Sequence, residues 1–203
     1  MKKLLTLLGA ALLAIALHAQ QNKKMKINVN DTAPDFIVTD VNNNNVTLSK
    51  FKGKKVLLTF YRNVGCPVCN LRFHELSQHD SFFKANNVVL IAVYESSSEN
   101  MLTYLANEEV YPRMIPDSSL LLYALYDLER STGKMLKSMF KGAMGKMKKG
   151  GKLFKAEMKQ DGNANRIGAE FLIDENGIVS IAHYGSYIGD DLPIEQIITA
   201  ITK

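Results

Sequence analysis

The sequence predicts a single α/β domain whose sheet is at least partly parallel. Two apolar runs that do not alternate, 56–61 and 88–94, are typical of strands covered on both faces. The segment between them, 66–84, has helical character, with Leu76 and Phe83 on one stripe. Strand, helix and strand in this order form a βαβ unit, whose crossover is almost always right-handed. The length of 203 residues and a composition of 46% hydrophobic and 22% charged residues fit one globular domain.

A hairpin is expected before this unit. The range 36–41 contains the β-branched residues Ile37 and Val38, and a second short run covers 46–48. The four residues between them, 42–45, are all asparagine, which tolerates the left-handed backbone of a turn. The pattern therefore predicts two antiparallel strands at the N-terminal side of the domain.

Two helices are expected after the second buried strand. Residues 96–99 offer an N-cap with a following glutamate, which predicts a helix over 101–110. Residues 111–117 contain two prolines, which end this helix and leave room for a short extended piece. Asp117 or the serine after it then caps a helix over 120–128.

The C-terminal part predicts a hairpin and a final helix. The β-forming runs 170–174 and 178–184 are joined by Glu175-Asn176-Gly177, whose residues suit a tight turn. Pro193 opens the last helix, in which apolar side chains recur at helical spacing at Ile194, Ile197, Ile198 and Ile201.

The N-terminus has the layout of a secretory signal. Lys2 and Lys3 precede an apolar run over 4–17, and small and polar residues follow at Ala19 and Gln20. The run is short for a membrane span, which needs roughly 20 apolar residues, although an uncleaved anchor is the alternative. We expect a signal peptide over 1–19, a polar linker over 20–30, one folded domain over 31–203, and export to the periplasm or the extracellular space.

The charge of the exported chain is mild. The chain has 25 basic and 20 acidic residues, so removal of Lys2 and Lys3 with the signal leaves a net charge of +3. Nothing in the sequence resembles a base-reading module, and we expect no nucleic-acid partner. Membrane contact is expected only transiently, through the signal peptide.

The range 134–155 differs in composition from the rest of the chain. It carries eight lysines, four methionines and four glycines. Such residues could form an amphipathic helix that faces a membrane or a partner. We favour a mobile surface insertion with one short helix whose methionines cover the core.

Cys66 and Cys69 are the only cysteines, and they directly follow the first buried strand. If a helix begins near Cys66, free N–H groups and the helix dipole stabilise its thiolate, and Arg62 and Arg72 could add positive potential. Pro67 suits the first helical turn. Cys69 lies one turn further, within reach of a disulfide. This arrangement predicts an exposed, nucleophilic Cys66 and a shielded, resolving Cys69.

Two other interpretations of the cysteine pair remain open. The cysteines could be small buried core residues. They could also bind a metal: zinc with His74 or His79, or copper with His183 and methionines of the insertion. The sequence shows no reason for these groups to converge, so we expect neither a metal nor another cofactor.

Four stretches of the chain resemble the AhpC/TSA redoxin branch of the thioredoxin superfamily. They are DTAPDF, LSKFKGKKVLLTFYRNVGCPVCNLR, YPRMIPDSSLLLYALYDLE and AEFLIDENGIVSIAHYGSYIGDDLP. The resemblance is to peroxiredoxin-like members with a C-P-x-C motif and covers 31–192 apart from the insertion. It implies a thioredoxin-like fold with a mixed sheet flanked by helices. It also implies a peroxidatic role for Cys66 and a resolving role for Cys69.

The sequence departs from both branches of that superfamily at helper positions. Peroxiredoxins usually have threonine or serine where this chain has Asn63, and proline where it has Thr59. Arg166 lies about two residues away from the position of their thiolate-stabilising arginine. Thioredoxins have a cis-proline where this chain has Ala169. Asn63 and Arg62 are therefore the candidate supporting residues beside Cys66.

These observations predict a thiol-based redox enzyme. The first hypothesis is a peroxiredoxin-like peroxidase, in which Cys66 reduces a peroxide and Cys69 closes an intramolecular disulfide. The alternative is a periplasmic oxidoreductase that exchanges with protein disulfides. A metal-binding module is the third hypothesis. Both redox hypotheses require a dithiol reductant protein as partner.

Overall fold

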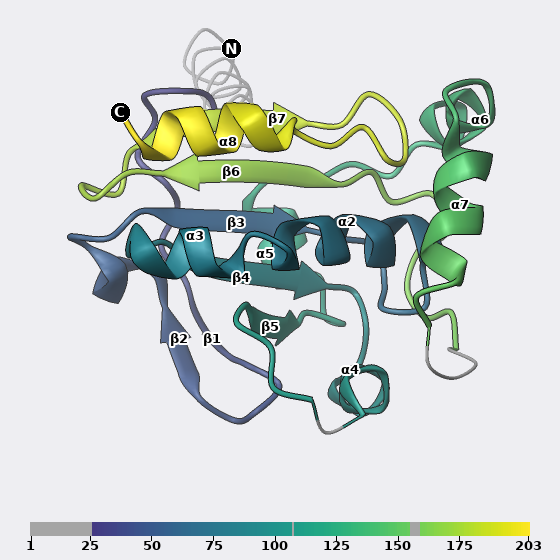
Figure 1. The fold of residues 1–203 in the computed structure, drawn as a ribbon, viewed down its shortest axis with the longest axis horizontal. Helices are drawn as coiled ribbons and strands as arrows, with labels where there is room; N and C mark the ends of the chain where they lie inside the picture. Colours follow the sequence, from purple (N-terminus) through teal and green to yellow (C-terminus); the bar gives the residue numbers. More distant parts are fainter. Residues whose placement is uncertain (1–25, 107, 155–158) are drawn as a thin grey trace, which may run out of the picture.

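The computed structural model describes residues 26–203, except residue 107 and residues 155–158. The expected signal peptide, 1–19, and residues 20–25 of the expected linker lie outside the described residues. The described chain forms a five-stranded mixed sheet in the order β5-β4-β3-β6-β7, flanked by helices (Figure 1). The strands are β3 (Val56–Phe60), β4 (Val89–Tyr94), β5 (Arg113–Pro116), β6 (Ala169–Ile173) and β7 (Val179–Tyr184).

The expected βαβ unit is confirmed. Strands β3 and β4 pair in parallel, with Leu58 opposite Ile91, and β5 continues this parallel part. On the other side of β3, strand β6 pairs antiparallel, with Leu58 opposite Phe171, and β7 closes the predicted hairpin. All five residues of β3 are buried, which explains why its sequence is apolar without alternation.

Helices cover both faces of the sheet. Helices α2 (Pro67–Ser77), α3 (Asp80–Ala85) and α8 (Ile194–Ile201) lie over one face, and α5 (Leu121–Leu125) lies behind the sheet in Figure 1. Successive strand residues point to opposite faces, so Leu57 packs in the first layer and Leu58 in the second.

The N-terminal hairpin is also confirmed. Strand β1 (Ile37–Thr39) pairs antiparallel with β2 (Asn45–Thr47), and a 3-10 helix, η1 (Leu48–Phe51), follows. The Asp40 carboxylate closes the turn by accepting bonds from the Asn42 and Asn44 N–H groups at 3.0 and 2.8 Å. Before this hairpin, the described end of the expected linker is bound to the domain: the Ile27 N–H donates to the Tyr184 hydroxyl at 2.9 Å.

Three helix predictions were wrong in their extent. The expected helix over 66–84 divides into α2 and α3, because the chain leaves helical geometry at His79, where φ is −107° and ψ is 12°. The expected helix over 101–110 is α4 (Ser98–Leu105), which begins after the Ser97 cap and ends at Ala106 in the left-handed region, with φ of 48°.

The third wrong extent is the expected helix over 120–128, which is the five-residue α5 (Leu121–Leu125). The Asp117 carboxylate accepts from the N–H groups of Leu121 and Leu122 at 2.9 and 2.8 Å, so Asp117 is the cap. Leu120 precedes the helix with φ of 63°, which prevents an earlier start.

The insertion forms two helices, which corrects the expectation of one short helix. Helix α6 (Thr132–Phe140) and helix α7 (Ala143–Gly151) make a hairpin at one end of the molecule, and α7 lies beside the start of α2 (Figure 1). Of the insertion's four methionines only Met135 packs against the core, whereas Met139, Met144 and Met147 are exposed. None of the described helices is long and apolar enough to cross a membrane.

Candidate active site

The two cysteines lie at the start of α2, the helix that follows β3 in the chain. Cys66 is the N-cap of the helix, with extended backbone at φ −82° and ψ 114°, and Pro67 occupies the first turn. The Cys66 sulfur accepts a hydrogen bond from the Cys69 N–H at 3.3 Å. The sulfur therefore takes the place of a capping side-chain oxygen, at the end of the helix where unpaired N–H groups favour negative charge.

The two sulfurs are in direct contact. Both cysteines are free thiols, and the Cys69 thiol donates a hydrogen bond to the Cys66 sulfur at 2.7 Å. The two sulfurs therefore lie close enough for the predicted Cys66–Cys69 disulfide to form.

The environment separates the pKa values of the two thiols. Burial by itself raises the pKa of Cys66, but the Cys69 thiol, the Arg62 charge and the N–H groups of Cys69 and Val68 outweigh it and lower this pKa to about 7. Burial raises the pKa of Cys69, and the adjacent Cys66 sulfur raises it further. A substantial fraction of Cys66 is therefore thiolate at neutral pH, whereas Cys69 retains its proton.

The expected exposure of Cys66 is wrong. Cys66 is only 1% exposed, less than Cys69 at 7%. The lowered pKa shows that this burial is not the apolar burial of an inert cysteine, because the sulfur keeps hydrogen-bond donors and a nearby cation. Cys66 therefore combines a lowered pKa with nearly complete burial.

The segment that follows the insertion packs beside Cys66. A Cβ added at Gly65 would lie 2.6 Å from the Lys159 carbonyl oxygen, so the backbone of this segment rests directly on the loop before Cys66. The Gln160 side chain donates to the Gly65 carbonyl. Asp161 anchors the same segment by accepting from the Ser96 hydroxyl at 2.7 Å, and Ser96 in turn accepts from the Val64 N–H at 2.9 Å.

Helix α7 also packs beside Cys66. A Cβ at Gly150 would overlap the Pro67 carbonyl oxygen, so glycine is required for this approach to α2. The Asn70 side chain donates to the Gly150 carbonyl at 3.1 Å. Lys146, also on α7, forms a salt bridge with Asp191 at 2.6 Å. The insertion is therefore part of the site rather than an appendage.

The two candidate supporting residues have different positions. Arg62 donates to the Ala164 carbonyl at 3.0 Å and lowers the pKa of Cys66 through its charge. Asn63 is buried, and its carbonyl accepts from the Cys66 N–H at 3.1 Å. Its side-chain oxygen has no hydrogen-bond partner among the described residues. Arg62 thus acts on the sulfur electrostatically, whereas Asn63 shapes the loop.

The residues that occupy the helper positions of peroxiredoxins and thioredoxins have structural roles in this protein. Arg166 forms a buried ion pair with Glu95 and donates to the Leu128 carbonyl at 2.6 Å, so its charge is neutralised locally. The Thr59 hydroxyl donates to the Ile91 carbonyl at 3.2 Å within the sheet. Ala169 pairs with Phe60, and no described peptide bond is cis.

A small cavity adjoins Cys69. It has a volume of about 30 Å³, room for about one water molecule, and is lined by Cys69, Tyr61, Ala169 and Glu170 among others. Glu170 is held by Arg72, whose guanidinium donates two bonds to it at 2.7 and 2.9 Å. This buried ion pair joins α2 to β6 directly below the cysteines.

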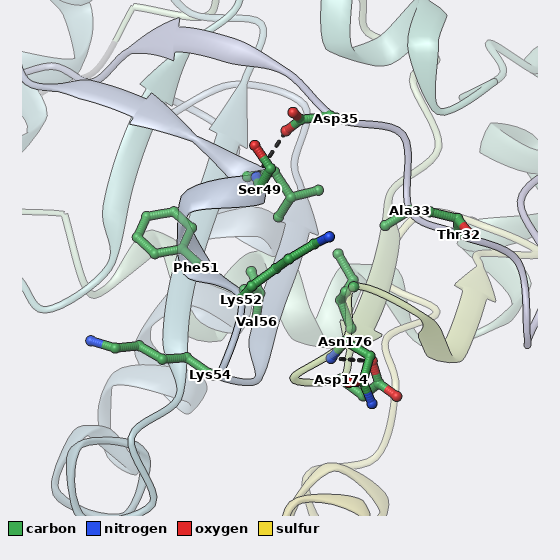
Figure 2. A pocket seen from close by; sticks show the side chains of 13 residues that line it. Thr32, Ala33, Asp35, Ser49, Phe51, Lys52, Lys54, Val56, Asp174 and Asn176 are labelled. Carbon is green, nitrogen blue, oxygen red and sulfur yellow. Dashed lines mark hydrogen bonds between the residues drawn. The ribbon is translucent and has the colours of Figure 1, made fainter.

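A larger cavity, of about 240 Å³, lies at the opposite end of β3 (Figure 2). Figure 2 shows Asp35, Lys52 and Asp174 around it. Because Val56, the first residue of β3, lines this cavity while the cysteines follow the last, the cavity is remote from the thiol chemistry.

Two of the three histidines considered as metal ligands, His74 and His183, have other partners. His74 contacts the Gln78 side chain on the exposed side of α2, and the His183 ring bonds the Asp190 carbonyl at 2.8 Å. Among the residues that the structure describes, no group of three or more His, Cys, Asp or Glu side chains could hold a metal ion.

Sequence reasoning missed the residues that cover the site. Lys159, Gln160 and Asp161 lie about ninety residues after the cysteines, and no local pattern links them to the site. Glu95 could have been noticed in the sequence, because it is an acidic residue that directly follows the apolar run of β4. In the structure it is almost fully buried, which is rare for glutamate without a partner.

A cysteine pair at the start of the helix that follows a central strand, in a sheet of order β5-β4-β3-β6-β7, defines a thioredoxin-fold dithiol protein. More narrowly, the chain belongs to the AhpC/TSA family, whose sequence model matches residues 29–182. This match confirms the resemblance that the sequence motifs indicated.

Individual relatives point to both kinds of thiol chemistry. The chain is 26% identical over 87 residues to a protein of Buchnera aphidicola named as the peroxiredoxin bcp, covering 43% of this chain and 55% of that one. It is 32% identical over 76 residues to the thiol-disulfide oxidoreductase ResA of Bacillus subtilis, covering 37% and 42%. The chain thus spans about half the length of these curated relatives.

A solved structure supports the fold. PrxQ from Xylella fastidiosa superposes with a TM-score of 0.64 at 15% identity, and the match covers 88% of this chain and 98% of that one. At this level of identity the match shows the fold alone, and the expected thioredoxin-like architecture is confirmed.

Proposed function

We propose that this protein is a thiol peroxidase that reduces peroxides through Cys66. The observation that carries the proposal is the contact between the sulfurs: Cys69 donates to Cys66 at 2.7 Å, and the pKa of Cys66 falls to about 7. A peroxiredoxin among the relatives supports the same chemistry.

The reaction needs two steps in the protein. The Cys66 thiolate attacks one peroxide oxygen, the O–O bond breaks, and the second oxygen leaves as an alcohol or water after taking up a proton. The Cys69 thiol then attacks the Cys66 sulfenic acid, which forms the Cys66–Cys69 disulfide and releases water. A dithiol protein returns both cysteines to thiols by exchange.

Burial favours a small substrate. Cys66 is 1% exposed, and its two neighbours in the chain are packed against other segments, Gly65 against Lys159 and Pro67 against α7. A peroxide requires only a small opening, whereas exchange with a protein disulfide requires the sulfur of a second polypeptide to reach Cys66 in line. The similarity to ResA and the departures at Asn63 and Thr59 keep protein-disulfide exchange as the second candidate function.

Rapid mixing of the reduced protein with hydrogen peroxide and, separately, with a disulfide-bonded protein tests both candidates. We expect one equivalent of peroxide to be consumed much faster than by free cysteine, with loss of both thiols. Cys69→Ser should stop at the sulfenic acid, which dimedone traps, and Cys66→Ser should be inert. Oxidation by peroxide no faster than that of free cysteine, with rapid oxidation by the protein disulfide, would replace the proposal by the second candidate.

We also infer that the protein is exported with loss of 1–19 and acts in the periplasm or outside the cell. The basis is the order of charged, apolar and small residues at the N-terminus. N-terminal sequencing of the protein recovered from a periplasmic extract should begin at Gln20. A chain that retains Met1 and sediments with membranes would indicate an uncleaved anchor.

A further inference from the structure

The outward face of the α6–α7 hairpin is unusually apolar. Of the large hydrophobic side chains that are exposed in the described chain, half lie on these two helices. Phe140 is 87% exposed. The outward-facing apolar side chains, here called the apolar face, are those of Leu136, Met139, Phe140, Met144 and Met147.

Helix α6 packs on the domain through Met135 and Ser138 and leaves most of its apolar side chains exposed. A surface helix normally turns its apolar stripe toward the core. Here Ser138 is buried, and its hydroxyl accepts from the Ile188 N–H at 2.7 Å, while Leu136, Met139 and Phe140 point outward at helical spacing. The contacts of the folded domain therefore do not explain these apolar side chains, which indicates that something outside the chain covers them.

The apolar face is surrounded by positive charge. From Ser131 to Phe154 the sequence contains no acidic residue. Lys134 and Lys146 pair with Glu129 and Asp191. The remaining lysines of the hairpin are exposed and have no salt bridge among the described residues: Lys137, Lys141, Lys148, Lys149 and Lys152.

We propose that the α6–α7 hairpin docks on an anionic phospholipid surface, with Phe140 and its apolar neighbours entering the interface and the lysines meeting the headgroups. Apolar side chains beside lysines on an exposed helix are the features that hold a helix in the plane of a membrane. The hairpin forms one end of the molecule, so it meets a broad surface before the rest of the domain does (Figure 1). Flexible methionines adapt to a fluid surface.

The chain offers a local probe of this docking, because it contains no tryptophan. In the full chain, Phe140→Trp places a single fluorophore on the apolar face. Ile37→Trp is the matched control, since Ile37 is 76% exposed on β1, away from the insertion. The emission of either tryptophan reports its own surroundings, so the readout does not depend on whether the N-terminal apolar run also binds lipid.

With vesicles containing phosphatidylglycerol, we expect the Phe140→Trp emission to shift to shorter wavelength and to be quenched by brominated acyl chains. Added salt should reverse the shift. Lys148→Gln with Lys149→Gln, in the Phe140→Trp chain, should weaken the apparent affinity about thirtyfold. The Ile37→Trp emission should not change.

Three results would overturn the proposal. The first is an unchanged Phe140→Trp emission on phosphatidylglycerol vesicles. The second is an equal shift on vesicles of phosphatidylcholine alone, which would show apolar adsorption without charge recognition. The third is a shift with polyglutamate but not with vesicles, which would assign the face to an acidic protein partner.

Discussion

Gly150 of α7 lies so close to the Pro67 carbonyl of α2 that no side chain fits between them. Pro67 directly follows Cys66, so this contact joins the insertion to the first turn of the active-site helix. The close approach of two backbones therefore helps to keep the Cys66 sulfur covered.

This contact predicts the effect of one methyl group. Gly150→Ala should push α7 away from α2, lower the free energy of unfolding by about 1–3 kcal/mol and accelerate alkylation of Cys66. Gly151→Ala is the matched control, because its Cβ would meet nothing within 4 Å. Because Gly151 is the last residue of α7, this change should alter the stability little and leave alkylation unchanged. Urea unfolding measures the stability of each variant, and iodoacetamide kinetics measure the access to Cys66. Equal alkylation rates in Gly150→Ala and the unaltered protein would show that α7 does not limit this access.

The lowered pKa of Cys66 predicts a pH profile. The thiolate is the reactive form, so the rate of alkylation or peroxide reduction should rise as the pH increases through about 7 and level off above it. Cys69→Ala removes a hydrogen bond to the thiolate and should move the midpoint to higher pH. An unchanged midpoint in Cys69→Ala would mean that the contact between the sulfurs does not stabilise the thiolate.

Arg62 is predicted to act through its charge. Arg62→Gln should raise the pKa of Cys66 and slow the reaction at neutral pH, while the rate above the new midpoint stays close to that of the unaltered protein. Arg113→Gln is a suitable control, because Arg113 lies on β5 and pairs with Asp40. A loss of rate at every pH would instead assign Arg62 to substrate binding.

The Arg72–Glu170 ion pair predicts a stability defect. Burial alone lowers the pKa of Arg72, but the adjacent Glu170 raises it above its usual range, so the arginine remains charged. Arg72→Met should leave Glu170 buried without its partner and cost about 3–5 kcal/mol. The double variant with Glu170→Gln should recover part of this loss in chemical denaturation. Equal stability of the single and double variants would show that the pair is not coupled.

Local chemistry made much of the fold predictable. The apolar runs of β3 and β4 can be stable only when covered on both faces, and the turn residues at 42–45 and 175–177 specify their hairpins. Helix ends were less predictable, because capping depends on which side chains reach the free N–H groups. The Asp117 carboxylate, for example, caps α5 at its actual start.

The sequence by itself determined where the two sulfurs lie: a cysteine pair at the N-terminus of the helix after β3, where free N–H groups favour a thiolate. Only the tertiary structure decided that Cys66 is covered. Lys159, Gln160 and α7, which are remote in sequence, pack against its neighbours Gly65 and Pro67. Such contacts depend on how distant segments pack, and no residue pattern near the cysteines specifies that packing.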